Sequence, residues 1–160
     1  RQDCGGLGTS SWNGPFTFTT LSPPPANDPC SGAIQVSCGS VVSGNTLNST
    51  IDGPATDCGG FSIAADNWYT ILGTGATITA SLCNVGTDYD TKLDIYTGSC
   101  GSLVSVGCND DGASCSFFES EYTWVSTIGT VYYIRVHGFS GDVGNYQMDI
   151  SCVGGPTTWI

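Results

Sequence analysis

Apolar and polar residues alternate with a period of two in several short segments of the chain. In residues 76–83 (ATITASLC), apolar side chains alternate with threonine and serine. The same alternation recurs in residues 92–96, 121–126 and 145–151, and it is typical of strands that are buried on one face. Residues 131–137 (VYYIRVH) are apolar at most positions, which predicts a central strand covered on both faces.

Helix signals are nearly absent from the chain. No segment keeps an i, i+3, i+4, i+7 apolar pattern over three turns, and the strong helix formers are scarce. Turn-forming residues separate the predicted strands, at positions 73–75, 97–99, 109–112, 128–130 and 140–142. Many short strands separated in this way predict an all-β fold, an antiparallel β-sandwich or jelly roll.

A proline-rich spacer divides the chain near its start. Residues 23–29 (PPPANDP) favour an extended, polyproline II conformation, and their prolines cannot donate the hydrogen bonds of a sheet. We therefore divide the chain into an N-terminal segment (1–22), the spacer (23–29), the sandwich (30–152) and a C-terminal tail (153–160).

The N-terminal segment contains one predicted extension strand, Gly14–Thr20 (GPFTFTT). Phe16 and Phe18 share one face of this strand, and a single strand cannot bury them against itself. The strand must therefore dock on its own sandwich, on a further domain or on a neighbouring molecule. The C-terminal tail ends on Trp159 and Ile160 and poses the same question.

The charge balance excludes two classes of partner. The 160 residues include 14 acidic and 3 basic side chains, a net charge of -11 at pH 7, so the chain repels nucleic acids and anionic membrane surfaces. It has no apolar run of about eighteen residues, so we expect no membrane insertion. It also lacks an initiator methionine and a signal-peptide pattern, as in a mature or excised segment. Nine cysteines are typical of an oxidising compartment, and we expect a secreted protein or one on the extracellular surface.

Eight of the nine cysteines fall within the predicted sandwich and permit four disulfides, at Cys30, Cys38, Cys58, Cys83, Cys100, Cys108, Cys115 and Cys152. Their connectivity stays open, because eight cysteines can pair in many ways. Cys108 and Cys115 bracket an Asn-Asp-Asp loop at a spacing that one disulfide can close, which would stabilise the fold by roughly 2 to 3 kcal/mol. The ninth, Cys4, pairs outside its own segment, pairs with another subunit or stays free.

The catalytic side chains of common hydrolases are missing from the sequence. His137 is the sole histidine, and no G-x-S-x-G motif accompanies it; we interpret it as an edge or strand-end residue with a local hydrogen bond. Glu119 and Glu121 lie two positions apart, which superficially suggests a glycosidase pair. We interpret them as solvated or salt-linked surface groups, and we expect no enzymatic activity.

Calcium is the candidate cofactor. Aspartates and one asparagine cluster in two predicted turns, at Asp88, Asp90, Asn109, Asp110 and Asp111. If both turns meet at one end of the sandwich, several carboxylates converge, which is costly without a cation. The alternative is that these side chains form Asx-turns, which need no ion.

The tryptophans fall into two groups. Trp68 and Trp124 lie in apolar strand patterns and are predicted core residues, although exposed tryptophans could instead form a sugar-binding platform. Trp12 and Trp159 lie in the end segments and are, with Phe16, Phe18 and Ile160, the candidate assembly residues. Asn48, in Asn-Ser-Thr, is the only N-glycosylation acceptor.

Two stretches resemble known modules of secreted bacterial proteins. Residues 1–20 (RQDCGGLGTSSWNGPFTFTT) resemble the last strands of a fibronectin type III module. The sandwich resembles pre-peptidase C-terminal domains in its motifs NDPC (27–30), DNWY (66–69), YDTKLDIY (89–96), NDD (109–111) and YYIRVHG (132–138). This resemblance implies a β-sandwich and secretion, and it implies no catalytic residues.

The leading functional hypothesis is a non-enzymatic structural protein that assembles with copies of itself into an extracellular fibril or filament. The predicted strand Gly14–Thr20 would be donated to a sheet edge of a neighbouring copy, and such a head-to-tail contact propagates without closing. The alternative is an accessory module of a larger secreted enzyme or adhesin, which would bind carbohydrate or protein.

Overall fold

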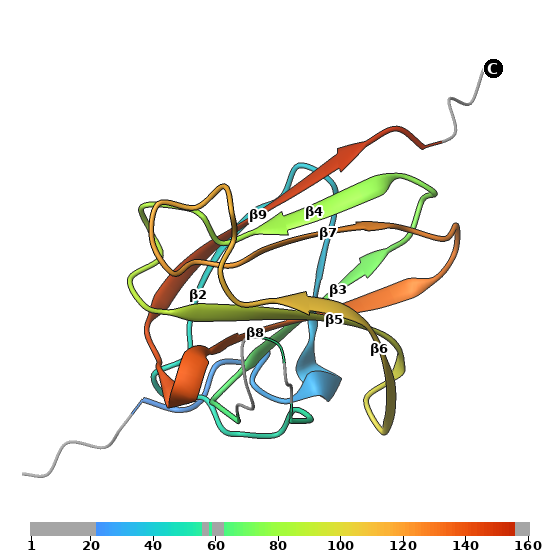
Figure 1. Ribbon diagram of the computed structural model, residues 1–160. Coiled ribbons are helices and arrows are strands. Elements are labelled where there is room, and N and C mark those ends of the chain that lie inside the picture. The colour runs from blue at the N-terminus through green and yellow to red at the C-terminus, as the bar shows by residue number, and fades with distance from the viewer. Residues whose placement is uncertain (1–21, 56–57, 59–62, 156–160) are drawn as a thin grey trace, which may run out of the picture.

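The computed structural model describes residues 22–55, 58 and 63–155 of the chain, which form two packed β-sheets (Figure 1). The five-stranded sheet has the order β1 (Ile34–Val36), β3 (Asn67–Leu72), β8 (Val131–Gly138), β5 (Thr91–Ser99) and β6 (Ser102–Asn109). The four-stranded sheet has the order β2 (Val41–Asn45), β9 (Asn145–Val153), β4 (Thr77–Ser81) and β7 (Glu121–Val125). Two 3-10 turns, η1 (Cys30–Gly32) and η2 (Phe139–Gly141), complete the fold, so the predicted β-sandwich is confirmed.

The strands β4, β5, β7, β8 and β9 lie where the hydrophobic pattern predicts them, whereas β1, β2 and β6 lie in segments without a predicted strand, and the predicted turn at 97–99 belongs to β5. Neighbouring strands pair antiparallel except β1 and β3, which run parallel. In β4 and β9 the apolar positions are buried and alternate with more accessible polar ones. β8 lies third among five strands and is buried over most of its length, as its apolar pattern predicts. No helix among the described residues is long and apolar enough to cross a membrane.

The main core lies between the two sheets. Ile78, Leu93, Ile134 and Met148 are fully buried there, and Trp124 packs against this core at 5% exposure. The predicted core position of both central tryptophans is confirmed, because Trp68 is also fully buried. Burial of apolar surface between the sheets is the main stabilising contribution.

A second, smaller core covers the outer face of the five-stranded sheet. Trp68 and Tyr96 pack there with Cys30, and their rings lie 6.0 Å apart. The connection between β2 and β3 adds Asp52 and Pro54, which accept hydrogen bonds from side chains of the sheet. The described residues of this connection, 46–55, 58 and 63–66, therefore cover part of that outer face.

Four disulfides join all eight cysteines of the sandwich, as predicted. They connect Cys30 to Cys100, Cys38 to Cys152, Cys58 to Cys108, and Cys83 to Cys115. The predicted Cys108–Cys115 bridge is wrong, because Cys108 lies on β6 beside the β2–β3 connection and pairs with Cys58. The spacing within one loop did not show that other loops lie closer in space.

The end of the predicted spacer belongs to the sandwich. Asn27 and Asp28 are 5% and 6% exposed. Asn27 donates to the Trp68 carbonyl at 3.2 Å, and Asp28 accepts from the Thr50 backbone at 2.6 Å. The proposed assembly residues Trp12, Phe16, Phe18, Trp159 and Ile160, together with Cys4, lie outside the described residues.

Candidate functional site

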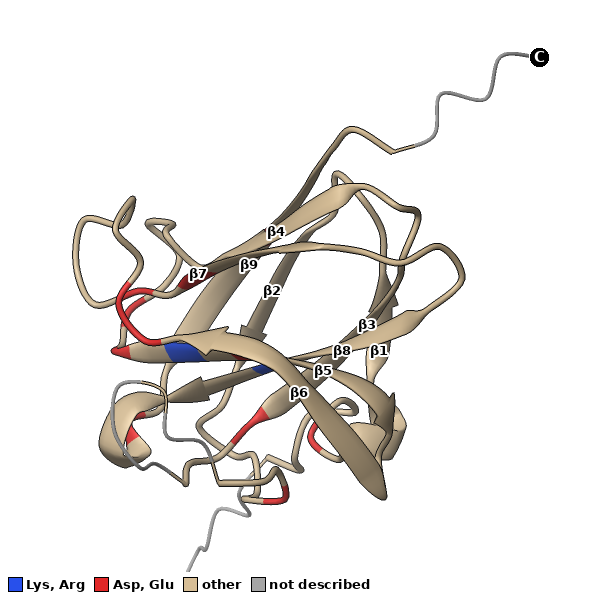
Figure 2. Ribbon diagram, turned by 45° about the vertical axis from the view of Figure 1, so that its right-hand side comes forward, with Lys and Arg blue, Asp and Glu red and all other residues tan. Residues whose placement is uncertain are grey.

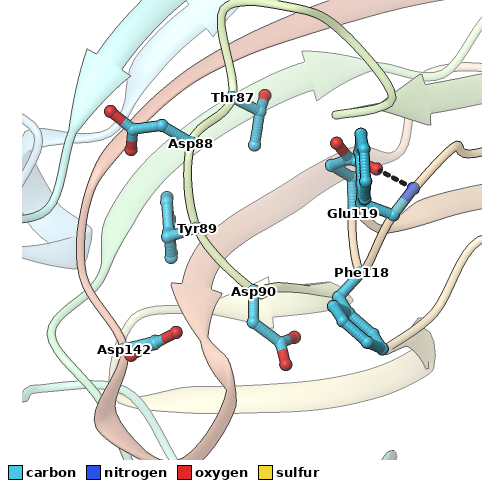
Figure 3. A pocket seen from close by; sticks show the side chains of 8 residues that line it. Thr87, Asp88, Tyr89, Asp90, Phe118, Glu119 and Asp142 are labelled. Atoms are coloured by element: carbon cyan, nitrogen blue, oxygen red, sulfur yellow. Dashed lines mark hydrogen bonds between the residues drawn. The ribbon is translucent and has the colours of Figure 1, made fainter.

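A cleft opens at one end of the sandwich, where three loops meet (Figure 3). Its volume is about 450 Å³. The loop between β4 and β5 forms one wall, the loop before β7 forms another, and Asp142 follows η2 at the base. The lining residues are Thr87, Asp88, Tyr89, Asp90, Phe117, Phe118, Glu119 and Asp142.

Two exposed phenylalanines form the aromatic wall. Phe117 is 77% exposed and Phe118 is 63% exposed, although both are large apolar side chains that burial would favour. Figure 3 shows the Phe118 ring on the same side of the cleft as the Asp90 carboxylate. Adjacent exposed aromatic rings on a loop are typical of a contact surface.

A disulfide and two hydrogen bonds hold this aromatic loop in place. The Cys83–Cys115 disulfide ties it to the end of β4. The Phe117 backbone N–H donates to Glu119 Oε2 at 3.0 Å (Figure 3), and Ser114 Oγ donates to Glu121 Oε1 at 2.7 Å. Both glutamates therefore stabilise the loop, and Glu119 is buried at 8% exposure, which corrects its interpretation as a surface group.

Other carboxylates lie near Asp90, which lines the cleft. Burial raises the pKa of Asp90 to about 6, and the negative charges of Asp110, Asp111 and Asp142 add to this shift. Burial also raises the pKa of Asp110. Lys92 Nζ lies 4.0 Å from Asp110 and opposes both shifts, yet one lysine leaves this end of the molecule with excess negative charge.

The predicted calcium ligands are only partly brought together. Asp90, Asp110 and Asp111 are close enough to repel one another electrostatically. Asp88 turns away, because both of its oxygens accept hydrogen bonds from Asn145, at 2.7 and 2.8 Å. Asn109 Oδ1 accepts from the Glu121 backbone at 3.0 Å, so Asp88 and Asn109 have structural roles, through bonds between distant segments and not through the local bonds of an Asx-turn.

Within the described part of the chain, no group of three or more acidic, histidine or cysteine side chains has the arrangement of a metal site. Calcium binding therefore stays a prediction. Asp90 Oδ1 and Asp110 Oδ1 are buried atoms without a hydrogen-bond partner there. These two oxygens are the groups with the most to gain from a positively charged ligand.

The basic side chains of the described chain are both buried. Lys92 and Arg135 are inaccessible to solvent, and Figure 2 shows the basic positions within strands while acidic positions also occupy loops. The third basic residue, Arg1, lies outside the described residues. The described surface therefore presents negative charge without exposed lysine or arginine, which favours cationic ligands.

Arg135 organises a buried ion network on the outer face of the five-stranded sheet. It lies 2.6 Å from Asp66 and 3.2 Å from Asp94, and it also donates to the Pro54 carbonyl at 2.6 Å. Burial raises the pKa of Asp66 to about 7, and Arg135 opposes that shift. The sequence pattern gave no signal for this network, because the alternation in residues 92–96 is typical of a strand whose polar face is exposed, and that face is buried in the structure.

His137 belongs to the same network: it lies at the end of its strand, as predicted, but β8 is a central strand and not an edge strand. It is fully buried on β8, and its Nε2 lies 2.9 Å from Asp94 Oδ2. Its Nδ1 is buried without a hydrogen-bond partner among the described residues. Burial lowers the pKa of His137, although Asp94 opposes the shift. A histidine sealed away from solvent in this way is placed for structural support and not for contact with a substrate.

Asn48, the predicted glycosylation site, is partly exposed in the turn after β2. It lines a shallow hollow together with Ser22, Pro23 and Pro25. Its modification stays a prediction. Of the candidate functional groups, the sequence missed Phe117 and Phe118; the only available signal was an adjacent aromatic pair in a segment with no strand pattern.

Comparisons with known proteins show similarity at the level of solved structures. No family model and no curated protein matches the sequence. The chain is similar to the pre-peptidase C-terminal domain of a collagenase from Bacillus anthracis, with 10% identity over 82% of this chain and 100% of that one, and a TM-score of 0.45. It is also similar to a periplasmic inhibitor of g-type lysozyme from Aeromonas hydrophila, with 13% identity over 76% of this chain and 97% of that one, and a TM-score of 0.47.

Proposed function

We propose that the chain is an extracellular binding module and that its ligand is a protein segment carrying a lysine or arginine beside apolar residues. The observation that carries this proposal is the cleft, which is lined both by the exposed rings of Phe117 and Phe118 and by the carboxylates of Asp90 and Asp142. An aromatic face attracts an ammonium or guanidinium group by about 0.5 to 2 kcal/mol. Carboxylates that lack sufficient counter-charge add a specific electrostatic attraction.

Carbohydrate is the less favoured ligand of this cleft. Sugars also stack on aromatic rings, but neutral hydroxyl groups do not relieve repulsion among carboxylates. Calcium would relieve that repulsion, yet Asp88 and Asn109 are engaged with backbone and side-chain partners. A cationic side chain can contact the aromatic rings and the carboxylates of the cleft at the same time.

The test compares a short peptide containing one lysine between leucines with the same peptide acetylated on that lysine, by calorimetry. We expect acetylation, Asp90→Asn and Phe118→Ser each to weaken binding about tenfold or more, a change of about 1.4 kcal/mol. Asp149→Asn is the matched control, because it removes an acidic group from β9, outside the cleft.

Equal binding of both peptides, or equal sensitivity to the Asp149 control, would contradict the proposal. A titration with calcium alone distinguishes the metal prediction: heat that Asp90→Asn and Asp110→Asn both abolish would favour calcium. Binding of a neutral glycan that depends on Phe118 but not on Asp90 would favour a carbohydrate ligand.

A second candidate function is self-assembly into an extracellular fibril by donation of the strand Gly14–Thr20. The observation that favours it is an open edge on each sheet, at β6 and β7, next to exposed apolar residues of β6. Electron microscopy of the full chain tests it directly. Filaments that disappear on deletion of residues 1–21 are expected, and monodisperse particles at all concentrations would contradict self-assembly.

A further inference from the structure

We infer that the free edge of β7 accepts the segment Gly14–Thr20 of a second copy of this chain, as a fifth strand of the four-stranded sheet. This inference rests on the proposed self-assembly and names its acceptor site. It is independent of the cleft at Phe117, which lies in the loop before β7.

The four-stranded sheet is one strand narrower than the sheet that it covers. β6 lies at the edge of the wider sheet, and two of its valines are exposed, Val104 at 59% and Val106 at 38%. Val104 pairs with Thr97, two positions after the inward-facing core residue Ile95. Because side chains alternate along a strand, Val104 points toward the layer of the four-stranded sheet, where no described strand covers it.

β7 lies over β6 at Gly107, three residues along β6 from Val104. The Tyr122 side chain packs over Gly107 of β6, since a Cβ at Gly107 would collide with the Tyr122 ring. β7 pairs only with β4 in the described sheet. One further strand beside β7 would lie about 4.8 Å beyond it, on the side of the four-stranded sheet that faces β6.

Alternate residues of β7 direct their backbone N–H and C=O groups toward its open edge. The bonds Leu82 N–H to Ser120 O and Ser126 N–H to Ala76 O show that even-numbered residues of this register face β4. The odd-numbered residues therefore face outward, and the Glu121 N–H is already capped by Asn109 Oδ1 at 3.0 Å. The N–H and C=O groups of Thr123 and Val125 remain open to an added strand.

The alternation of apolar and polar residues in Gly14–Thr20 suits a strand beside β7, which would have one face toward β6 and one toward solvent. With Phe16 and Phe18 facing inward, the phenylalanines would cover Val104 of β6 and bury apolar surface on both partners. Thr17 and Thr19 would then face outward and continue the hydroxyl-rich outer surface, where Thr79 and Thr123 share a hydrogen bond of 2.8 Å.

Chain connectivity requires the donor to come from another molecule. Ser22 lies beside Ser43 and Asn45 of β2, at the edge of the four-stranded sheet opposite to β7. Thr20 is two residues from Ser22 and thus within about 7 Å of it. A strand added to β7 would lie four strand spacings from β2, or about 19 Å. The segment can reach its own β2 edge but not its own β7 edge, so each copy donates to the next.

The experiment measures self-association of the full, disulfide-bonded chain by sedimentation velocity over a range of concentrations. Thr123→Pro removes an outward N–H from β7 without breaking a bond to β4, which is where an edge strand tolerates proline. Ser43→Pro is the matched control: the bonds Thr46 N–H to Gly144 O and Ile150 N–H to Ser40 O place the Ser43 N–H on the outward side of β2. Phe18→Asp changes the donor.

We expect Thr123→Pro and Phe18→Asp each to weaken self-association at least about tenfold, because a buried charge or a blocked edge is incompatible with strand addition. Ser43→Pro should leave it unchanged. Circular dichroism of each variant checks that the sandwich is intact. An unchanged Thr123→Pro assembly would overturn the β7 site while leaving self-assembly standing, and sensitivity to Ser43→Pro alone would assign the strand to β2. A wild-type chain that stays monomeric would overturn both the site and self-assembly.

Discussion

The outer faces of the two sheets differ in what covers them and in what they contain. The five-stranded sheet carries Arg135, Lys92 and His137 on its outer face, all fully buried beneath the connection between β2 and β3 and the loops around it. The four-stranded sheet carries hydroxyl residues such as Thr79 and Thr123, together with exposed valines, and no described segment lies over them.

This difference shows where the few basic side chains of the described chain lie and what surrounds them. A buried charge needs partners and a cover that excludes water, and the five-stranded sheet supplies both through Asp66, Asp94 and Pro54. Hydroxyl groups can be hydrated and need no cover. Because both described basic residues are buried, the charged side chains on the described surface are acidic. Contact with another molecule therefore relies on aromatic groups, open strand edges or cationic ligands.

The largest expected effect comes from removing the central cation of the covered face. Arg135→Met leaves Asp66 and Asp94 buried without their main counter-charge, and breaking a buried ion pair on one side costs roughly 3 to 5 kcal/mol. Denaturant unfolding of the variant measures the loss. Adding Asp66→Asn to this variant should recover part of the stability, and a total loss below about 1 kcal/mol would mean that the network contributes little.

A smaller effect is expected from acidification of the same face. Burial lowers the pKa of His137 below its ordinary value of 6.5, so the unfolded chain binds this proton more readily than the folded one. The stability due to neutral His137 is therefore present above pH 6.5 and lost as the pH falls through that value, by at most about 1.4 kcal/mol per pH unit.

Unfolding of wild type and His137→Gln between pH 7.5 and about 5 measures this effect. The raised pKa of Asp66 has the opposite sign, since stability linked to it is lost as the pH rises toward 7, and it is common to both proteins. The difference between the two curves isolates the histidine. Parallel curves would show that His137 does not distinguish the folded from the unfolded state.

The smallest effect is expected on the bare face. Thr79→Val removes the hydroxyl that pairs with Thr123 on the solvent side but keeps a β-branched side chain, so the free energy of unfolding should change by less than about 0.5 kcal/mol. Thermal unfolding of a dilute sample measures it. A loss well above about 1 kcal/mol would indicate that a second molecule covers this face in solution.

Features that depend on residues close together in the sequence could be predicted, and features that depend on distant residues could not. The strands β4, β8 and β9 were predictable because alternation is a local property of the chain. The buried roles of Trp68 and Trp124 followed from the same pattern. The Cys58–Cys108 disulfide and the contact of His137 with Asp94 join segments that only the pairing of strands brings together, so no local spacing could reveal them.

The acidic residues show the same limit at the candidate site. Their clustering at Asp88–Asp90 and Asn109–Asp111 was evident in the sequence, yet only the folded chain shows that both Asp88 oxygens are bound by Asn145, whereas Asp90 Oδ1 has no hydrogen-bond partner among the described residues. The exposure of Phe117 and Phe118 could not be predicted either, because an apolar pair in a loop can be buried or exposed to solvent.

By itself, the sequence determined the class of fold, the acidic exterior and the need for disulfides. Period-two alternation, net charge and cysteine content can be read from the residues without knowing which of them meet in space. Tertiary structure decided which sheet face is covered, which cysteines pair and which strand edges stay open. Those properties depend on the order of strands in each sheet, and that order is set by contacts between residues far apart in the chain.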